Sequence, residues 1–172
     1  MNNMISFLED DKKFNFRVCA IILDSSKRRV LIQMIEGRDY YVLPGGRVEW
    51  MESSTKALKR ELFEELGLEN LELKARALME YFFERKKDLF YHEVGHCFVT
   101  VLKENEPIQT MQDFNGKEGD FSTFKWVEID KIDDYEIKPK RLMHIIKNYD
   151  APYEYMDLEE RIKWFQQKIE QN

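Results

Sequence analysis

The chain has 172 residues, enough for one domain with a hydrophobic core. Its net charge of -6 and its lack of a Lys/Arg cluster argue against a surface that neutralises nucleic-acid phosphates or anionic lipids. The N-terminus has no basic end followed by an apolar run, and no apolar run reaches the length of a membrane span, so we expect a cytoplasmic protein.

The first 50 residues predict two strands and a sharp turn. Residues 14 to 24 (FNFRVCAIILD) alternate apolar side chains on one face, and residues 30 to 36 (VLIQMIE) follow a charged turn with a similar composition. Pro44-Gly45-Gly46 then interrupts the pattern and lets the backbone approach a ligand closely. Cys19 and Cys97 lie in apolar runs without CxxC spacing, which favours buried free thiols.

Residues 53 to 66 predict a helix. Apolar side chains recur there at spacings of three and four, at Ala57, Leu58, Leu62 and Leu66. Ser53 or Ser54 can cap the start, and Gly67 suits the end. This predicted helix also carries the carboxylates Glu61, Glu64 and Glu65.

The second half of the chain predicts further strands and two helices. Strands are expected over residues 71 to 83 and 90 to 102, joined by a charged turn. A loop over 104 to 120 precedes a short strand (FKWVEI) and a helix near 138 to 148.

The last apolar residues, Leu158, Ile162, Phe165 and Ile169, have helical spacing and predict a C-terminal helix over 157 to 169. We expect a domain over residues 1 to 150 and a helical extension over 151 to 172 packed on it. A dimer contact or a cover over a substrate cleft is the alternative for this helix.

Residues 92 to 96 (HEVGH) match the pattern with which a helix holds zinc in metalloproteases. The surrounding segment alternates like a strand, however, and would place His92 and His96 about 13 Å apart. The only other histidine is His144, far along the chain. A zinc metalloprotease is therefore a remote alternative.

Three carboxylates gather near the end of the predicted helix. Glu61, Glu64 and Glu65 stand at i, i+3 and i+4, where mutual repulsion and the helix dipole disfavour negative charge. Hard oxygen ligands in such a cluster suit Mg²⁺ or Mn²⁺. The alternative is a solvated acidic face.

The run from residue 46 to 68 resembles the Nudix box. Its nine specified positions are Gly46, Glu52, Arg60, Glu61, Leu62, Glu64, Glu65, Gly67 and Leu68. The resemblance implies an α/β fold, the Nudix-like α/β/α sandwich with a mixed β-sheet, over about residues 14 to 148. It also implies a MutT-like nucleotide pyrophosphatase that binds Mg²⁺ or Mn²⁺ through the three glutamates of the cluster, with Glu64 and Glu65 in catalysis.

The same resemblance implies that Glu52 and Arg60 orient the loop and the catalytic carboxylates. Gly45 and Gly46 would let the backbone approach the substrate. Arg38 and Arg47 flank this loop and could hold phosphate oxygens, or could be exposed arginines without such a role.

A general base must be sought outside the metal ligands, whose lone pairs are engaged. Glu118, in the loop NGKEGD, resembles the loop glutamate that serves as base in some MutT-type enzymes. A solvated turn glutamate is the alternative, and Asp113, Asp120 or Glu93 could serve instead.

These features predict a divalent-cation-dependent hydrolase that cleaves a phosphoanhydride in a nucleoside diphosphate linked to another group, through attack of metal-activated water on phosphorus. The alternative is a Nudix-like module that senses a nucleotide without cleaving it. The expected partner is a small-molecule nucleotide, with no nucleic acid or membrane, in a monomer or homodimer. Aromatic residues that could stack a base, or belong to the core, are Tyr40, Tyr41, Phe82 and Phe83.

Overall fold

The computed structural model describes residues 3–86 and 88–159. Its central feature is one nine-stranded sheet with the order β7-β8-β3-β2-β6-β5-β9, in which β1 also pairs with β2 and β4 with β3. In chain order the strands are β1 (Ser6–Glu9), β2 (Lys12–Leu23), β3 (Arg29–Ile35), β4 (Tyr41–Val42), β5 (Lys74–Lys86), β6 (Leu89–Val101), β7 (Phe114–Gly116), β8 (Gly119–Glu128) and β9 (Glu154–Glu159).

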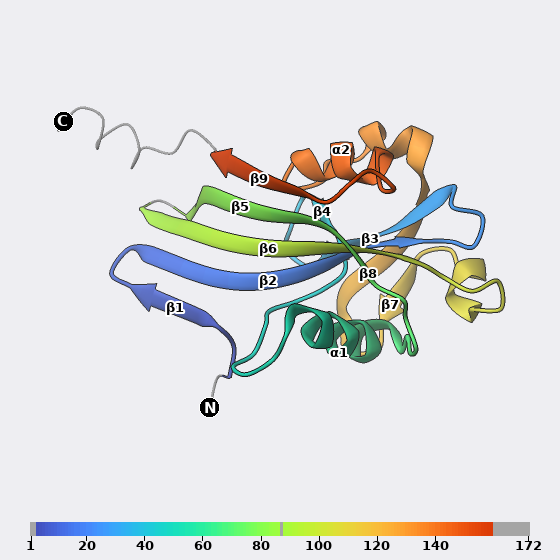
Figure 1. Ribbon diagram of the computed structural model, residues 1–172, viewed down its shortest axis with the longest axis horizontal. Helices are drawn as coiled ribbons and strands as arrows, with labels where there is room; N and C mark the ends of the chain where they lie inside the picture. The colour runs from blue at the N-terminus through green and yellow to red at the C-terminus, as the bar shows by residue number, and fades with distance from the viewer. Residues whose placement is uncertain (1–2, 87, 160–172) are drawn as a thin grey trace.

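The sheet is mixed. β2 and β6 pair in parallel in its centre, in an unbroken register from Lys12 opposite Phe90 to Leu23 opposite Val101. β9 is parallel to β5, and the other neighbouring pairs are antiparallel. The hairpin of β5 and β6 extends with β1 and the start of β2 beyond the body of the molecule (Figure 1).

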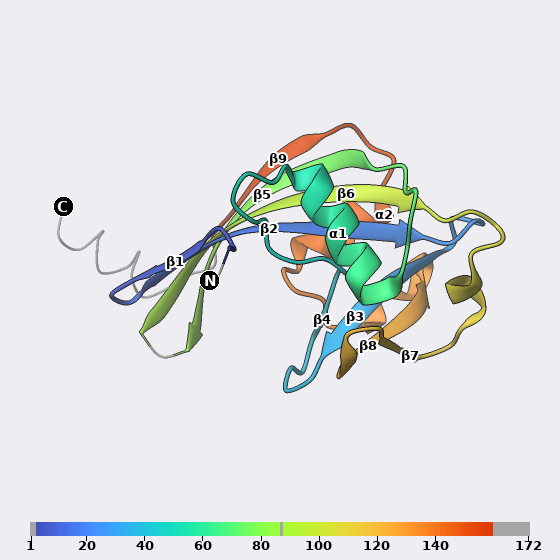
Figure 2. The same ribbon diagram turned by 90° about the horizontal axis from the view of Figure 1, so that it is seen from below.

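Two α-helices cover opposite faces of the sheet (Figures 1 and 2): α1 (Ser54–Leu66) on one side and α2 (Arg141–Lys147) on the other. Two short 3₁₀ helices, η1 (Pro107–Thr110) and η2 (Ile129–Asp134), lie in the connections. The predicted α/β/α sandwich with a mixed sheet is confirmed.

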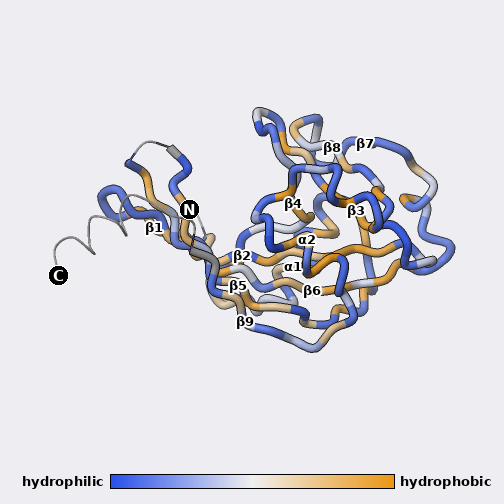
Figure 3. The backbone as a smooth tube through the Cα atoms, turned by 90° about the horizontal axis from the view of Figure 1, so that it is seen from above, coloured by the Kyte–Doolittle hydropathy of each residue, from blue (hydrophilic) through white to orange (hydrophobic). Residues whose placement is uncertain are grey.

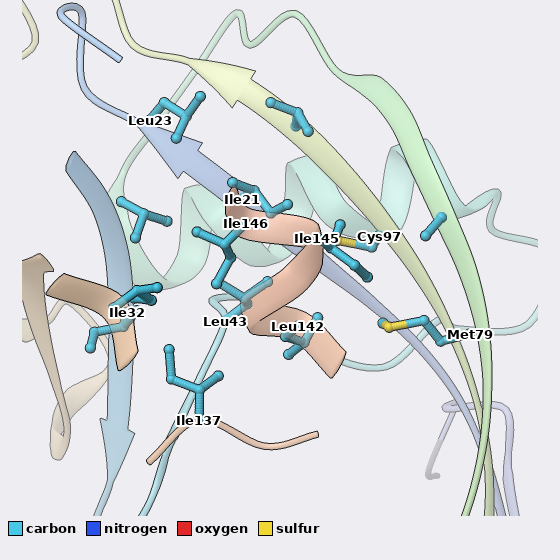
Figure 4. Close-up of a cluster of buried hydrophobic side chains, with 14 of the residues drawn as sticks. Ile21, Leu23, Ile32, Leu43, Met79, Cys97, Ile137, Leu142, Ile145 and Ile146 are labelled. Atoms are coloured by element: carbon cyan, nitrogen blue, oxygen red, sulfur yellow. The ribbon is translucent and has the colours of Figure 1, made fainter. Parts of the chain in front are cut away.

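Two apolar clusters hold the layers together. The α1 cluster lies between the sheet and α1 and includes Val18, Ala20, Ile22, Ala57, Leu58, Leu62 and Phe98. The α2 cluster lies on the other face and includes Ile21, Leu23, Ile32, Leu142, Ile145 and Ile146 (Figure 4). Alternate residues of β2 thus serve opposite faces, as the period of a strand requires. Figure 3 shows hydrophobic stretches along the central strands and hydrophilic loops at the rim.

The predicted strands over 14 to 24, 30 to 36, 71 to 83 and 90 to 102, and the helix over 53 to 66, are confirmed with small shifts of their ends. Residues 92 to 96 lie in β6, so they form a strand and not the helix of a zinc-protease motif. The ring of His92 contacts Glu80, with Nε2 2.7 Å from Oε1. His96 packs beside Phe98, with ring centroids 4.3 Å apart. Both thiols are free, with Cys97 buried and Cys19 half-buried.

The prediction of a loop over 104 to 120 was wrong in part. This segment contains η1 and β7, and β8 begins at Gly119, before the predicted strand. Long-range pairing explains the difference, because β8 follows β3 as far as Ser122 opposite Ile35. The rings of Phe114 and Phe124 also stack at 5.6 Å between β7 and β8.

The end of the described chain also differs from the prediction. Residues 154 to 159 form β9, which pairs with the edge of β5, so residues 157 to 159 belong to a strand rather than a helix. The remainder of the predicted helix lies outside the described residues. In the described part of the chain, no helix is long and apolar enough to cross a membrane.

Candidate active site

The helix α1 is fixed at both ends. The Ser53 side chain accepts a hydrogen bond from the N–H of Lys56, at 3.3 Å. At the other end Gly67 adopts the left-handed conformation (φ 71°), and its N–H turns back to the carbonyls of Leu62 and Phe63. With its apolar face buried in the α1 cluster, the helix carries Glu61, Glu64 and Glu65 on its last two turns.

Glu65 is the most buried carboxylate of the three, at 6% exposure. It accepts hydrogen bonds from Gln33 Nε2 at 2.8 Å and from the N–H of Gly45 at 3.2 Å. Burial raises the pKa of Glu65 to about 7; Glu61 and Glu118 add to this increase, while the two hydrogen bonds oppose it.

Glu61 lies directly beneath the backbone of Gly46. A Cβ at position 46 would stand 2.1 Å from Cδ of Glu61, so this approach requires glycine. Burial raises the pKa of Glu61, and the neighbouring Glu64 and Glu118 add to the effect, whereas Arg60 lowers it. The preceding Gly45 has φ 139°, and a Cβ there would stand 2.3 Å from the carbonyl oxygen of Val18.

Arg60 joins the helix to the loop before it. Its Nε and one terminal nitrogen pair with the two oxygens of Glu52, each at 3.0 Å, and hydrogen bonding to Arg60 lowers the pKa of Glu52. The same terminal nitrogen donates to the carbonyl of Arg47 at 3.0 Å. The other terminal nitrogen contacts Glu61 at 2.9 Å and Glu64 at 3.1 Å.

The β7–β8 hairpin reaches the C-terminal end of α1. The N–H of Lys117 donates to the carbonyl of Glu65 at 2.8 Å. The Lys117 ammonium lies over Gly67, where a Cβ would stand 1.9 Å from Nζ, and it therefore faces the negative end of the helix dipole. The next residue is Glu118, which lies close enough to raise the pKa of both Glu61 and Glu65.

The donor chemistry of this cluster fits a hard divalent cation. Glu61, Glu64 and Glu65 offer carboxylate oxygens, and a positive ion would offset the burial and the smaller mutual repulsion that raise the pKa of Glu61 and Glu65. Arg60 supplies part of that charge where it contacts Glu61 and Glu64. Within residues 3–86 and 88–159, no group of three or more His, Cys, Asp or Glu side chains is already arranged to hold a metal.

A cleft of about 210 Å³ lies on the opposite face of the sheet. Arg17 of β2 lines it, next in the chain to Phe16 and Val18, whose side chains face α1. The other basic lining residues are Arg38, Arg47, Arg85 and Lys138, and the aromatic ones are Tyr40, Tyr81, Phe83 and Tyr91.

Basic side chains outnumber carboxylates in this cleft, five against Glu84 and Glu93. Among the described residues, none of the five forms an ion pair within 4 Å. Burial lowers the pKa of Arg38 and the like charges of Arg17 and Arg85 lower it further, while Tyr40 and Glu93 oppose this shift. The ring of Tyr40 lies 5.5 Å from the guanidinium carbon of Arg38 and 4.6 Å from the ammonium of Lys138. Such a site favours an anion that also carries a ring.

One loop connects the cleft to the carboxylates. Gly46 packs on Glu61, and the next residue, Arg47, lines the cleft. Arg47 also forms an isolated bridge with Arg17 of β2. Adjacent residues of this loop therefore contact the acidic cluster and line the cleft.

The structure brings most of the predicted site residues together. Around the cluster it places Gly45, Gly46, Glu52, Arg60, Glu61, Glu64, Glu65 and Glu118, and in the cleft Arg38 and Arg47. Glu93 also lines the cleft, where it accepts from Asn15 at 3.1 Å. Asp113 pairs instead with Lys125 at 3.1 Å, and Asp120 accepts a hydrogen bond from Asn115 at 2.7 Å.

Of the four aromatic residues considered for base stacking, Tyr40 and Phe83 line the cleft. Tyr41 packs against the α2 cluster, and Phe82 packs beside His92. Sequence reasoning missed Gln33, although a polar residue inside the apolar strand VLIQMIE was a signal. It also missed Arg17, Arg85, Lys117 and Lys138, which long-range folding brings to the site.

Comparison with known proteins adds a family match. The family model described as NUDIX domain matches residues 13–148. Over 76 residues the chain is 40% identical to the 8-oxo-dGTP diphosphatase of Haemophilus influenzae, covering 41% of this chain and 56% of that protein. The chain thus spans about half the length of this curated relative.

Solved structures with a similar fold include MutT proteins. A structure from work on MutT of Aliivibrio salmonicida and Vibrio cholerae is 21% identical, with a TM-score of 0.58. The superposition covers 79% of this chain and 98% of that chain. The MutT protein of Bacillus halodurans is also 21% identical, with a TM-score of 0.59 and coverage of 84% and 90%. At these identities the likeness concerns the fold.

Proposed function

Because the chain belongs to the Nudix family, we propose that it is a divalent-cation-dependent hydrolase that cleaves a phosphoanhydride in a nucleoside diphosphate linked to another group. The observation that carries this proposal is the loop at residues 44 to 47, which joins the buried carboxylates of α1 to the cation-lined cleft. An acidic cluster for a cation and a basic cleft for an anion meet there.

The residues divide into two groups in this proposal. Arg17, Arg38 and Lys138 bind phosphate oxygens, and Tyr40 contacts the nucleoside. Glu61, Glu64 and Glu65 hold Mg²⁺ or Mn²⁺, which when bound supplies neutralisation of the diphosphate and acidification of water.

The remaining groups orient other residues of the site or transfer a proton. Arg60 keeps Glu61 and the loop carbonyl of Arg47 in one arrangement through its pair with Glu52. Glu118 takes the proton of the attacking water, since it stands near the cluster on a hairpin tip between two glycines. Proton transfer by a carboxylate outside the ligand set leaves the cation site intact.

A nucleoside triphosphate is the favoured substrate. The partly matching relative is an 8-oxo-dGTP diphosphatase by name, which supports a substrate with three phosphates. The cleft has five cationic side chains against two carboxylates, which also suits a highly charged anion better than a neutral sugar.

The test is a substrate panel with purified protein. We would incubate dGTP, 8-oxo-dGTP and ADP-ribose with Mg²⁺ or Mn²⁺, with and without EDTA, and identify the products. Cation-dependent release of pyrophosphate and a nucleoside monophosphate from a triphosphate is expected.

Two variants on α1 form a matched test and control. Glu64→Gln should lower turnover at limiting Mg²⁺ by roughly a hundredfold or more, whereas Lys59→Gln on the exposed side of α1 should not. Nucleotide binding without cleavage of any panel member would identify a sensing module and contradict the proposal.

A further inference from the structure

The two cysteines of the chain stand side by side in the central pair of strands. Cys19 of β2 and Cys97 of β6 are register partners in the parallel ladder, and both lie on the face of the α2 cluster (Figure 4). Neighbouring strands run about 4.7 to 4.9 Å apart. A disulfide requires about 4.4 to 6.8 Å between its Cα atoms, so this pair meets the condition.

The two thiols differ in their access to solvent. Cys97 is fully buried, whereas Cys19 is half-buried. A hydrogen bond with the Cys19 thiol and burial raise the pKa of the Cys97 thiol, while the charge of the buried Arg76 opposes this shift. Cys97 therefore keeps its proton, and Cys19 is the thiol that an oxidant from solvent reaches first.

The loop at residues 44 to 47 lies against the backbone of Cys19. The N–H groups of the residues before and after Cys19 donate to carbonyls of this loop, each at 2.9 Å. A Cβ at Gly45 would stand 2.8 Å from the Cα atom of Cys19. Because the N–H of Gly45 also donates to Glu65 at 3.2 Å, a displacement of Cys19 reaches the loop and the buried carboxylate.

Closure of a disulfide would produce such a displacement. The Cβ atoms of a disulfide stand about 3.8 Å apart, which is closer than the spacing of about 4.7 to 4.9 Å between neighbouring strands. Cys19 must therefore move towards Cys97 and away from the loop. A bond closed under such strain is also easier to reduce, which makes the modification reversible.

We propose that Cys19 and Cys97 form a redox-modification site, at which a peroxide closes a reversible intrachain disulfide that displaces the loop at residues 44 to 47. The modification acts on the loop that joins the acidic cluster to the cleft. Neither the bond nor the displacement depends on the enzymatic activity proposed above.

The reaction proceeds in two steps. The sulfur of Cys19 attacks an oxygen of hydrogen peroxide, the O–O bond breaks, and a sulfenic acid and water form. The sulfur of Cys97 then displaces the hydroxyl group from Cys19 as a second water, so that the S–O bond breaks and the S–S bond forms. The two thiols lose two protons and two electrons, which convert the peroxide to water.

The intact mass of the full chain tests the disulfide. Reduced protein is treated with hydrogen peroxide, unfolded, and labelled with N-ethylmaleimide. We expect a monomer lighter by two hydrogen atoms that takes up no label, and that takes up two labels after treatment with dithiothreitol. Since the chain has two cysteines, an intrachain bond can join only this pair. Uptake of two labels after oxidation, or a disulfide between two chains, would overturn the proposal.

Matched variants test the order of the two steps. In Cys97→Ala, oxidation should stop at the sulfenic acid of Cys19, which dimedone traps. In Cys19→Ala, the buried Cys97 should take up no dimedone. Cys97→Ser replaces Cys97→Ala if the latter fails to fold. Equal trapping in the two variants would contradict the assignment of Cys19 as the reactive thiol.

Hydrogen exchange tests the displacement of the loop. In the oxidised protein, the amides of Val18, Ala20 and Gly45 should exchange roughly tenfold faster or more, because their hydrogen bonds join β2, the loop and Glu65. The paired segment of β8, residues 122 to 128, should not change. Peroxide-treated Cys97→Ala should exchange as the reduced protein does. A closed disulfide with unchanged exchange at these three amides would overturn the coupling to the loop.

Discussion

Gly46 lies so close to Glu61 that a Cβ at position 46 would stand 2.1 Å from the carboxyl carbon. We therefore expect Gly46→Ala to displace Glu61 or the loop and to lower kcat at least roughly tenfold, because small displacements of catalytic groups are costly. The measurement is steady-state turnover at saturating Mg²⁺. Gly95→Ala is the control, since a Cβ there meets only Met79 at 3.5 Å; equal activity of both variants would contradict the role of this approach.

Glu118 is expected to act as the base. Glu118→Gln should lower kcat by roughly 10²- to 10⁴-fold and flatten the acidic limb of the pH profile, with cation affinity nearly unchanged. Kinetics across pH and calorimetric titration with Mn²⁺ measure the two properties. Asp120→Asn, in the same hairpin, should behave as wild type. Normal kcat in Glu118→Gln would assign proton transfer to Glu64 or Glu65.

Arg38 should contribute to substrate binding. Its guanidinium stands over Tyr40 in the cleft without an ion-pair partner among the described residues. Arg38→Ala is expected to raise KM by roughly 10- to 100-fold with a smaller effect on kcat, because a phosphate contact worth about 1.5 to 3 kcal/mol is lost. Arg28→Ala, at an exposed turn, is the control. An unchanged KM would place the phosphates elsewhere.

Asp24 should make stability depend on pH. Burial raises its pKa, but hydrogen bonds from the backbone of Arg29, from Ser26 and from the Arg29 side chain outweigh burial, so the net pKa is lowered. Its contribution is then complete above the ordinary value of about 4 and is lost as pH falls through the lower, folded value.

Asp24→Asn should therefore lower the free energy of unfolding by about 1 to 3 kcal/mol at pH 7, and by less at pH 3. Urea denaturation at both values measures the difference. The exposed Asp130→Asn removes the same charge and should have little effect at either pH. A deficit in Asp24→Asn that stays constant between pH 7 and pH 3 would refute the linkage.

Local features of the site could be predicted from the sequence. The spacing of apolar residues predicts α1, and its period places Glu65 three residues after Leu62 and seven after Leu58, on the face that the structure buries. Ser53 and Gly67 act as the caps that their residue types indicate. These signals lie within one or two helical turns, so chain neighbours suffice to determine them.

The rest depends on contacts between distant segments. Arg17 meets Arg47 only because the loop after β4 runs antiparallel beside β2, and Gln33 reaches Glu65 only because β3 lies beneath α1. β9 likewise forms because β5 offers a free edge. A sequence pattern within one segment does not show which distant segment will pair with it. The pattern over residues 157 to 169 therefore predicted a helix, although residues 157 to 159 lie in β9.

The parallel pairing of β2 with β6 has a consequence for biosynthesis. Residues paired across these strands stand 78 positions apart in the chain, as Asn15 and Glu93 do. Closing such a loop costs conformational entropy before the strand pairing can stabilise it. The full pairing also cannot form until the ribosome has released residue 101. Until then the apolar strand β2 lacks its parallel partner β6, so the nascent chain should be a substrate for chaperones that bind exposed strands.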